Sequence, residues 1–129
     1  MDSAKLLANR WQCPDGTILQ SFHRHDCKFH TDMKTGETCM VDGGLGYYIH
    51  LSGNLKDLCI NTESPFEEIR EFFHWGHRGK DGKQPLEYVP LFSLTTEHIE
   101  AIVESQWHIP DYIKDVFLQE LEYRKERND

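Results

Sequence analysis

Several features that define common protein classes are missing from this 129-residue chain. No apolar run approaches the roughly 18 residues that a membrane-spanning helix needs. The N-terminal residues lack the apolar segment of a secretory signal peptide. None of the four cysteines forms a CxxC pair, which excludes a zinc finger. We therefore expect a cytoplasmic protein whose thiols are free and mostly packed.

Sequence signatures of familiar enzymes are missing as well. There is no Gly-x-Ser-x-Gly nucleophile elbow, no His-Glu-x-x-His zinc motif and no GxxxxGK[ST] loop between a strand and a helix. No cysteine lies in an obvious Cys–His nucleophile context. A covalent hydrolase is thus unsupported, and a protein that binds without catalysis is favoured over an enzyme.

Basic residues are scarce relative to acidic ones. The chain has 14 Lys and Arg against 22 Asp and Glu, which gives a net charge of −8 with neutral histidines. Nucleic-acid binding is disfavoured because it needs a basic footprint. Acidic mimicry of DNA would suit the net charge, but Lys and Arg are spread through the chain, so we rank that hypothesis last.

The first sixty residues have the pattern of short strands joined by turns. Residues 13–16 and 32–37 are turn sequences, and the second predicts a hairpin. Residues rich in β-formers predict strands at 17–22, 28–31, 38–41, 47–51 and 55–61. An exposed edge of such a sheet can pair with a second copy, so a homodimer is one alternative for the oligomeric state.

The second half has the periodicity of helices. One helix is predicted from Pro65 to Trp75, ended by Gly76, and further helices start near Thr95 and Pro110. The charged tail, residues 124–129, is expected to fray. Strands followed by helices predict a single α+β domain over residues 1–129, with a small antiparallel sheet in the N-terminal half and about three helices packed on one face.

A glycine-rich basic loop is predicted at residues 76–83. Its three glycines fall three apart and are interleaved with cations, and only Asp81 opposes them. Glycines allow backbone amides to converge on an anion, and arginine can donate two parallel hydrogen bonds to a phosphate. The residues assigned to ligand binding in this loop are Gly76, Arg78, Gly79, Lys80, Gly82 and Lys83.

Two aromatic residues extend the ligand-binding hypothesis. Trp75 precedes the loop and Tyr47 belongs to a tyrosine pair, so either ring is a candidate to stack on the base of a nucleotide. The loop follows a predicted helix, whose dipole opposes an anion at that end. A flexible charged connection remains the alternative interpretation of the loop, and a place at the rim of the core that of the two rings.

Histidines concentrate in a second segment near residue 25. His23 and His25 share one face if this segment continues a strand, and Asp26 follows directly. Asp42 and His30 are further candidate ligands. The alternative hypothesis is a metal-dependent phosphoesterase or nuclease that holds a divalent ion with His23, His25 and Asp26. A partly solvated sheet edge, with these rings hydrogen-bonded to neighbours, is the structural alternative.

The chain contains WQCPDGTILQS at residues 11–21, His25-Asp26, VDGG at residues 41–44 and WGHRGKDGK at residues 75–83. Together these segments resemble a group of short, uncharacterised bacteriophage-encoded proteins, over about residues 9–124. The resemblance implies no reaction and no catalytic residue. It implies a small accessory protein made during infection, where many such products bind or neutralise a host component.

These observations together predict a phage-type accessory protein of the host cytoplasm that acts by binding and needs no cofactor. Its partner would be a phosphate-bearing small molecule such as a signalling nucleotide, or a host defence protein. The metal-dependent enzyme, with a divalent ion as its cofactor, is the alternative.

Overall fold

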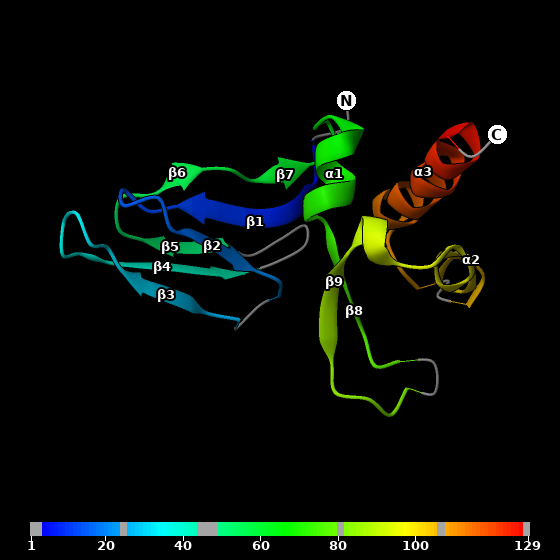
Figure 1. Cartoon of the computed structure of the whole chain (residues 1–129), viewed down its shortest axis with the longest axis horizontal. Coiled ribbons are helices and arrows are strands. Elements are labelled where there is room, and N and C mark those ends of the chain that lie inside the picture. The colour runs from blue at the N-terminus through cyan, green and yellow to red at the C-terminus, as the bar shows by residue number, and fades with distance from the viewer. Residues whose placement is uncertain (1–3, 24–25, 44–48, 80–81, 106–107, 128–129) are drawn as a thin grey trace. The chain divides into compact units, whose positions relative to one another are not determined.

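The computed structural model describes residues 4–23, 26–43, 49–79, 82–105 and 108–127 (Figure 1). The chain divides into two compact units, Met1–Pro65 and Phe66–Asp129, which are described in turn. Small antiparallel sheets make up the first unit, and the three α-helices lie in the second. The predicted α+β class, with strands in the N-terminal half and helices in the C-terminal half, is confirmed. The prediction of a single domain stays a prediction.

Unit 1 contains two sheets. In the first, β1 (Leu6–Gln12) pairs antiparallel with β2 (Ile18–Ser21), β6 (Lys56–Asp57) and β7 (Ile60–Asn61). In the second, β4 (Thr38–Gly43) lies between β3 (Lys28–Thr31) and β5 (Ile49–Ser52). The sequence predicted one sheet of consecutive strands without β1. The structure corrects this, because β1 pairs with β2, β6 and β7, and β3, β4 and β5 form a separate sheet.

The core of unit 1 lies between these two sheets, which form the layers seen in Figure 1. One cluster of buried residues in it comprises Cys13, Leu19, Cys39 and Val41. Strand β4 shows the expected alternation over its first four residues, since Cys39 and Val41 are buried and Thr38 is exposed. Strand β1 lacks this signal, because three consecutive residues of it are buried.

Alkylation of the native protein is expected to reach Cys27 well before the other three cysteines. Cys27 is exposed, whereas Cys13 and Cys39 are buried and Cys59 is half-buried. Burial raises the pKa of Cys13 to about 11 and that of Cys59 to about 12, so their reactive thiolates are scarce at pH 8. Mass spectrometry after timed iodoacetamide treatment measures the order of labelling. Two or more equally fast adducts would contradict this core, and urea-unfolded protein is the control.

Unit 2 begins with α1 (Phe66–Phe72) and continues through β8 (His74–His77) and β9 (Glu87–Pro90) to the short 3-10 helix η1 (Leu91–Ser93). Helices α2 (Thr96–Ser105) and α3 (Asp111–Arg127) complete it. Among the described residues, no helix combines the length and the apolar character that crossing a membrane requires.

Aromatic rings form the centre of unit 2. Phe73 and Phe117 are both fully buried, and their rings meet edge to face with centroids 5.9 Å apart. The Trp75 ring packs edge-on against Phe117 at 5.0 Å. Helices α2 and α3 start next to the predicted residues, and their apolar faces include the buried Ile99 and Ile113, as the periodicity predicted.

Two predictions about unit 2 are wrong. The first helix was expected to reach Trp75, but it ends at Phe72 and the chain continues as β8. Pairing with β9 and packing on Phe117 outweigh the local helical periodicity here. The tail was expected to fray from residue 124, but α3 continues to Arg127, and Arg124 is tied down by hydrogen bonds.

Candidate functional site

The predicted basic loop connects two paired strands. His77 of β8 lies opposite Glu87 of β9 in an antiparallel pair, and the chain between them closes a hairpin. We call residues 78–86 the hairpin tip. Figure 1 shows the hairpin extending away from the helices of its own unit. Of the described residues of the tip, all but Gly79 are exposed.

At two of the loop's positions, the structure of the hairpin explains why the residue is glycine. A Cβ atom at Gly76 would lie 2.9 Å from the Tyr88 ring and 3.2 Å from the end of Leu86, so glycine lets these side chains pack across the strand. Gly79 has a φ of +79°, and a Cβ atom there would collide with the side chain of Gln84. These glycines shape the hairpin whether or not it binds a ligand.

Backbone amides at the tip are engaged within the hairpin. The Gly79 N–H donates to Nδ1 of His77 at 3.1 Å, and the Gly82 N–H donates to the Gly79 carbonyl at 3.2 Å. The Gln84 N–H donates to the Arg78 carbonyl at 2.9 Å. These three amides therefore serve the turn itself.

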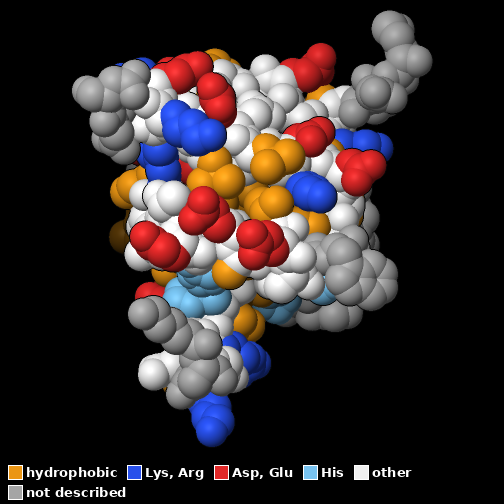
Figure 2. All heavy atoms as spheres, turned by 90° about the vertical axis from the view of Figure 1, so that its right-hand side faces the viewer, with side chains coloured by type: hydrophobic (Ala, Val, Ile, Leu, Met, Phe, Trp, Pro, Cys, Tyr) orange, Lys and Arg blue, Asp and Glu red, His pale blue; other side chains and the backbone are white. Residues whose placement is uncertain are grey.

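The cationic side chains of the tip are exposed. The side chains of Arg78 and Lys83 are exposed. Leu86, which directly precedes β9, is 45 % exposed. Figure 2 shows basic side chains on the hairpin, at the bottom of the view, with histidine side chains just above. Lys80, assigned to the same site from the sequence, lies outside the described residues.

Of the two aromatic candidates, the structure describes only Trp75. Trp75 is half-buried, and its ring packs on Phe117 at 5.0 Å and lies 6.4 Å from that of Phe73. This is the core-rim position that the sequence left open as the alternative. Tyr47 lies outside the described residues.

A pair of histidines lies at the base of the hairpin, and no pattern in the sequence indicated this pair. The rings of His77 and His98 meet edge to face, with centroids 5.3 Å apart and an interplanar angle of 81°. Burial lowers the pKa of His98, and the neighbouring His77 lowers it further. The two residues are 21 positions apart in the chain, so no local sequence motif could predict that their rings meet.

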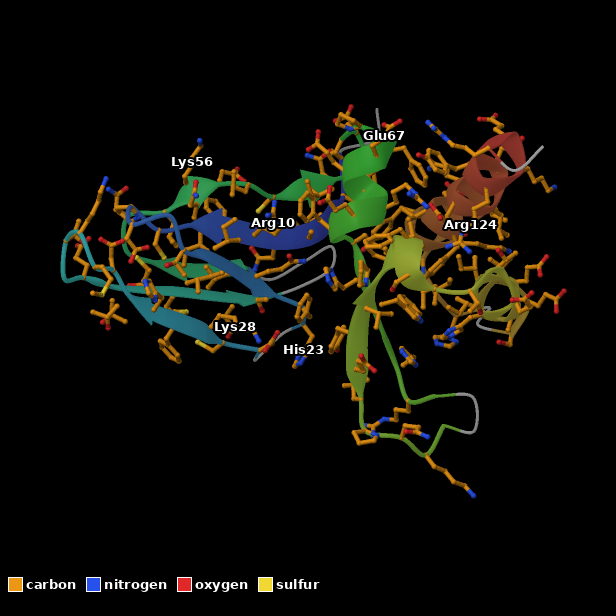
Figure 3. The ribbon with its side chains drawn as sticks, viewed as in Figure 1. Arg10, His23, Lys28, Lys56, Glu67 and Arg124 are labelled. Atoms are coloured by element: carbon orange, nitrogen blue, oxygen red, sulfur yellow. The ribbon has the colours of Figure 1, made fainter. Side chains whose placement is uncertain are left out.

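The candidate metal ligands of unit 1 are only partly described. His23 is exposed and His25 lies outside the described residues. The Asp26 carboxylate accepts a hydrogen bond from the Phe22 N–H at 2.8 Å, and it lies 3.3 Å from Nζ of Lys28. Figure 3 shows His23 and Lys28 at the same end of this unit. The carboxylate thus already has a turn amide and a cation as partners.

The two further candidates are also engaged elsewhere. Asp42 accepts a hydrogen bond from the Gly43 N–H at 2.7 Å, and Nε2 of His30 lies 2.7 Å from Oδ2 of Asp15. Within the described part of the chain, no group of three or more His, Cys, Asp or Glu side chains is arranged to hold a metal ion. Because His25 is not described, the metal site stays a prediction.

Two turn aspartates form a cluster that the sequence analysis did not assign. Oδ1 of Asp32 accepts the Asp15 N–H at 2.7 Å, and Oδ2 of Asp15 accepts the Met33 N–H at 2.8 Å. His30, hydrogen-bonded to Asp15, holds the pKa of that carboxyl well below its usual range, and the Met33 amide adds to the effect. This reciprocal pairing connects the β1–β2 turn to the β3–β4 turn. The carboxylate oxygens involved accept hydrogen bonds from other residues of unit 1, so their role is structural.

A buried carboxylate in unit 2 is likewise structural. Glu120 is fully buried, and its two oxygens accept hydrogen bonds from Arg70 and Arg124. Burial by itself raises the pKa of Glu120, but the hydrogen bonds from the two guanidinium groups outweigh it, and the pKa is lowered overall. Figure 3 shows Arg124 on α3, and its remaining N–H groups reach the chain before α2.

Comparisons with known proteins provide no relative from which to transfer a function. A scan against protein-family models found no match, and searches of curated proteins and of solved structures found none either. The exposed cationic hairpin tip is therefore the candidate site that the geometry and charge of the chain favour.

Proposed function

We propose that this protein acts by binding, and that its hairpin tip contacts an acidic surface of a partner protein. The observation that carries the proposal is the exposure of Arg78 and Lys83 on a projecting hairpin of a chain whose net charge is −8. A local positive patch on an acidic protein favours one orientation of approach to an acidic surface and repels others.

The chemistry of the tip favours a protein partner over a nucleotide. The amides of Gly79 and Gly82 donate hydrogen bonds inside the turn, so the proposal relies on the side chains of the tip and not on a phosphate cradle of these two amides. Arg78 offers a planar fork for a carboxylate, and the half-exposed Leu86 of the same hairpin offers an apolar side chain. Arginine is enriched at protein–protein contact sites.

The resemblance to phage-encoded proteins extends the proposal to its setting. We propose that the partner is a host protein and that binding occurs in the host cytoplasm. The proposal involves no cofactor and no catalytic turnover.

Reversing the charge of the tip is expected to abolish capture of the partner. Affinity purification from host cells would compare the wild type with the double variant Arg78→Glu/Lys83→Glu. We expect at least about a tenfold loss of the captured partner, because an arginine anchor at a contact site contributes a large share of the binding energy. Quantitative mass spectrometry of the eluates measures the loss.

The matched control is Lys34→Glu/Lys56→Glu, which makes the same charge change at two exposed lysines of unit 1. Near-ultraviolet circular dichroism checks that each variant keeps its fold. Equal capture by all three proteins would contradict a role for the tip. A small molecule retained by the wild type in native mass spectrometry, and lost in Arg78→Ala, would replace the protein partner with a nucleotide-like ligand.

A further inference from the structure

The hydrogen bond at the base of the hairpin fixes the protonation of His77. Nδ1 of His77 accepts the Gly79 N–H at 3.1 Å, so this nitrogen must present a lone pair. The neutral ring then carries its proton on Nε2. A metal ion needs a nitrogen lone pair, and the one on Nδ1 is already engaged, so the pair with His98 does not constitute a metal site.

Protonation of His77 cannot leave this hydrogen bond intact. The imidazolium ring has an N–H group at both nitrogens, so Nδ1 would direct a proton at the Gly79 N–H. Gly79 is the first glycine of the tip, and its carbonyl accepts the Gly82 N–H. Movement of Gly79 would therefore also disturb the hydrogen bond from Gly82, in the turn that follows Arg78.

The charged groups around His77 come from three elements. On its own chain, the cationic Arg78 follows it, and on β9 the exposed carboxylate of Glu87 lies opposite. On α2, His98 packs its ring against that of His77, and the exposed Glu97 precedes it.

We propose that His77 is a pH-sensitive latch: when neutral it holds the Gly79 N–H, whose residue in turn accepts the Gly82 N–H, and when protonated it releases Gly79. Histidine is the side chain suited to this role, because its ordinary pKa of about 6.5 lies within the physiological range. Its ring is the acceptor for Gly79 in the neutral state only. The inference rests on the proposed function in one respect: release of the tip weakens partner binding, because a mobile tip must be ordered again on contact.

The test follows the Gly79 amide of the full chain by NMR hydrogen exchange between pH 7.5 and pH 5.5. In the wild type we expect the protection factor of this amide to fall about fivefold, the equilibrium equivalent of one net hydrogen bond. In His77→Asn, the side-chain oxygen replaces Nδ1 as acceptor and does not titrate, so the protection factor stays constant. His23→Asn, an exposed histidine in unit 1, is the matched control and keeps the wild-type response.

The midpoint of the Gly79 change must also coincide with the titration of the His77 ring, read from its own imidazole signals in the wild type. This second measurement decides the question even if His77→Asn does not fold. A wild-type Gly79 amide that is insensitive to pH, or one that responds with a different midpoint, would overturn the latch. No partner is needed, so failure here is distinct from failure of the proposed binding function.

Discussion

Replacing Glu120 with alanine is expected to lower the free energy of unfolding by about 3 to 5 kcal/mol. The side chain is fully buried, and it accepts hydrogen bonds of 2.9 and 2.8 Å from Arg70 and of 2.7 Å from Arg124. Its removal leaves two arginine side chains, 24 % and 15 % exposed, without their shared counter-charge. Urea denaturation followed by circular dichroism measures the change.

The size of this effect follows from where the network lies. Arg124 also donates to the Thr96 hydroxyl at 3.0 Å and to the Leu94 carbonyl at 2.7 Å, so it links α3 to the start of α2. Arg70 comes from α1 and stacks over the Tyr123 ring, 4.3 Å from its centroid. Loss of Glu120 thus loosens the attachment of α1 and α2 to α3.

The matched control is Glu122→Ala, an exposed carboxylate on the same helix, with an expected change within about 0.5 kcal/mol. Glu120→Gln keeps the size of the side chain but not its charge, so we expect it to fall between the control and Glu120→Ala. Equal stability of Glu120→Ala and Glu122→Ala would show that the network contributes nothing to the fold.

Replacing Asp32 with alanine is expected to lower the Tm by about 5 °C or more. Asp32 is 1 % exposed, and its oxygens accept the N–H groups of Asp15, Lys34 and Thr35 and the Thr35 hydroxyl. Alanine would leave these donors unsatisfied and would release one turn from the other. Thermal unfolding measures the change. Glu37→Ala, an exposed carboxylate in the same turn, is the control and should leave the Tm almost unchanged.

The contribution of Asp32 should depend on pH in a defined direction. Burial by itself raises the pKa of its carboxyl, but the amides of Asp15 and Thr35 outweigh burial, and the pKa is lowered overall from the ordinary 3.8. A lowered folded-state pKa stabilises the protein fully above the unfolded value, and this stabilisation is lost as the pH falls towards the folded value. The Tm difference between the wild type and Asp32→Asn should therefore be large at pH 7 and smaller at pH 3. A difference that grows at pH 3 would contradict this assignment.

Local features of the fold were predictable from the sequence. The turn at residues 13–16 is closed by the Gly16 N–H donating to the Cys13 carbonyl, as its Pro-Asp-Gly sequence indicated. The β3–β4 hairpin and the starts of α2 and α3 also lie where the local sequence predicted them. Each of these signals lies within a few residues of chain, where backbone preference and periodicity act directly.

The candidate site was predictable only in outline. Glycine spacing and charge identified the loop that carries Arg78 and Lys83. They did not reveal that the Gly79 and Gly82 N–H groups donate hydrogen bonds within the turn. Nor did they reveal that Trp75 leaves its predicted helix and packs on Phe117. Strand pairing and ring packing with distant residues decide both points.

The sequence by itself determined the α+β class, with strands in the first half and helices in the second, and the position of a cationic loop. Only the tertiary structure decided that β1 forms a separate sheet with β2, β6 and β7, that Glu120 lies buried between two arginines, and that His77 meets His98. The physical reason is that these features depend on contacts between residues far apart in the chain. Their energy arises from burial and from hydrogen-bond partners that exist only once the chain has folded.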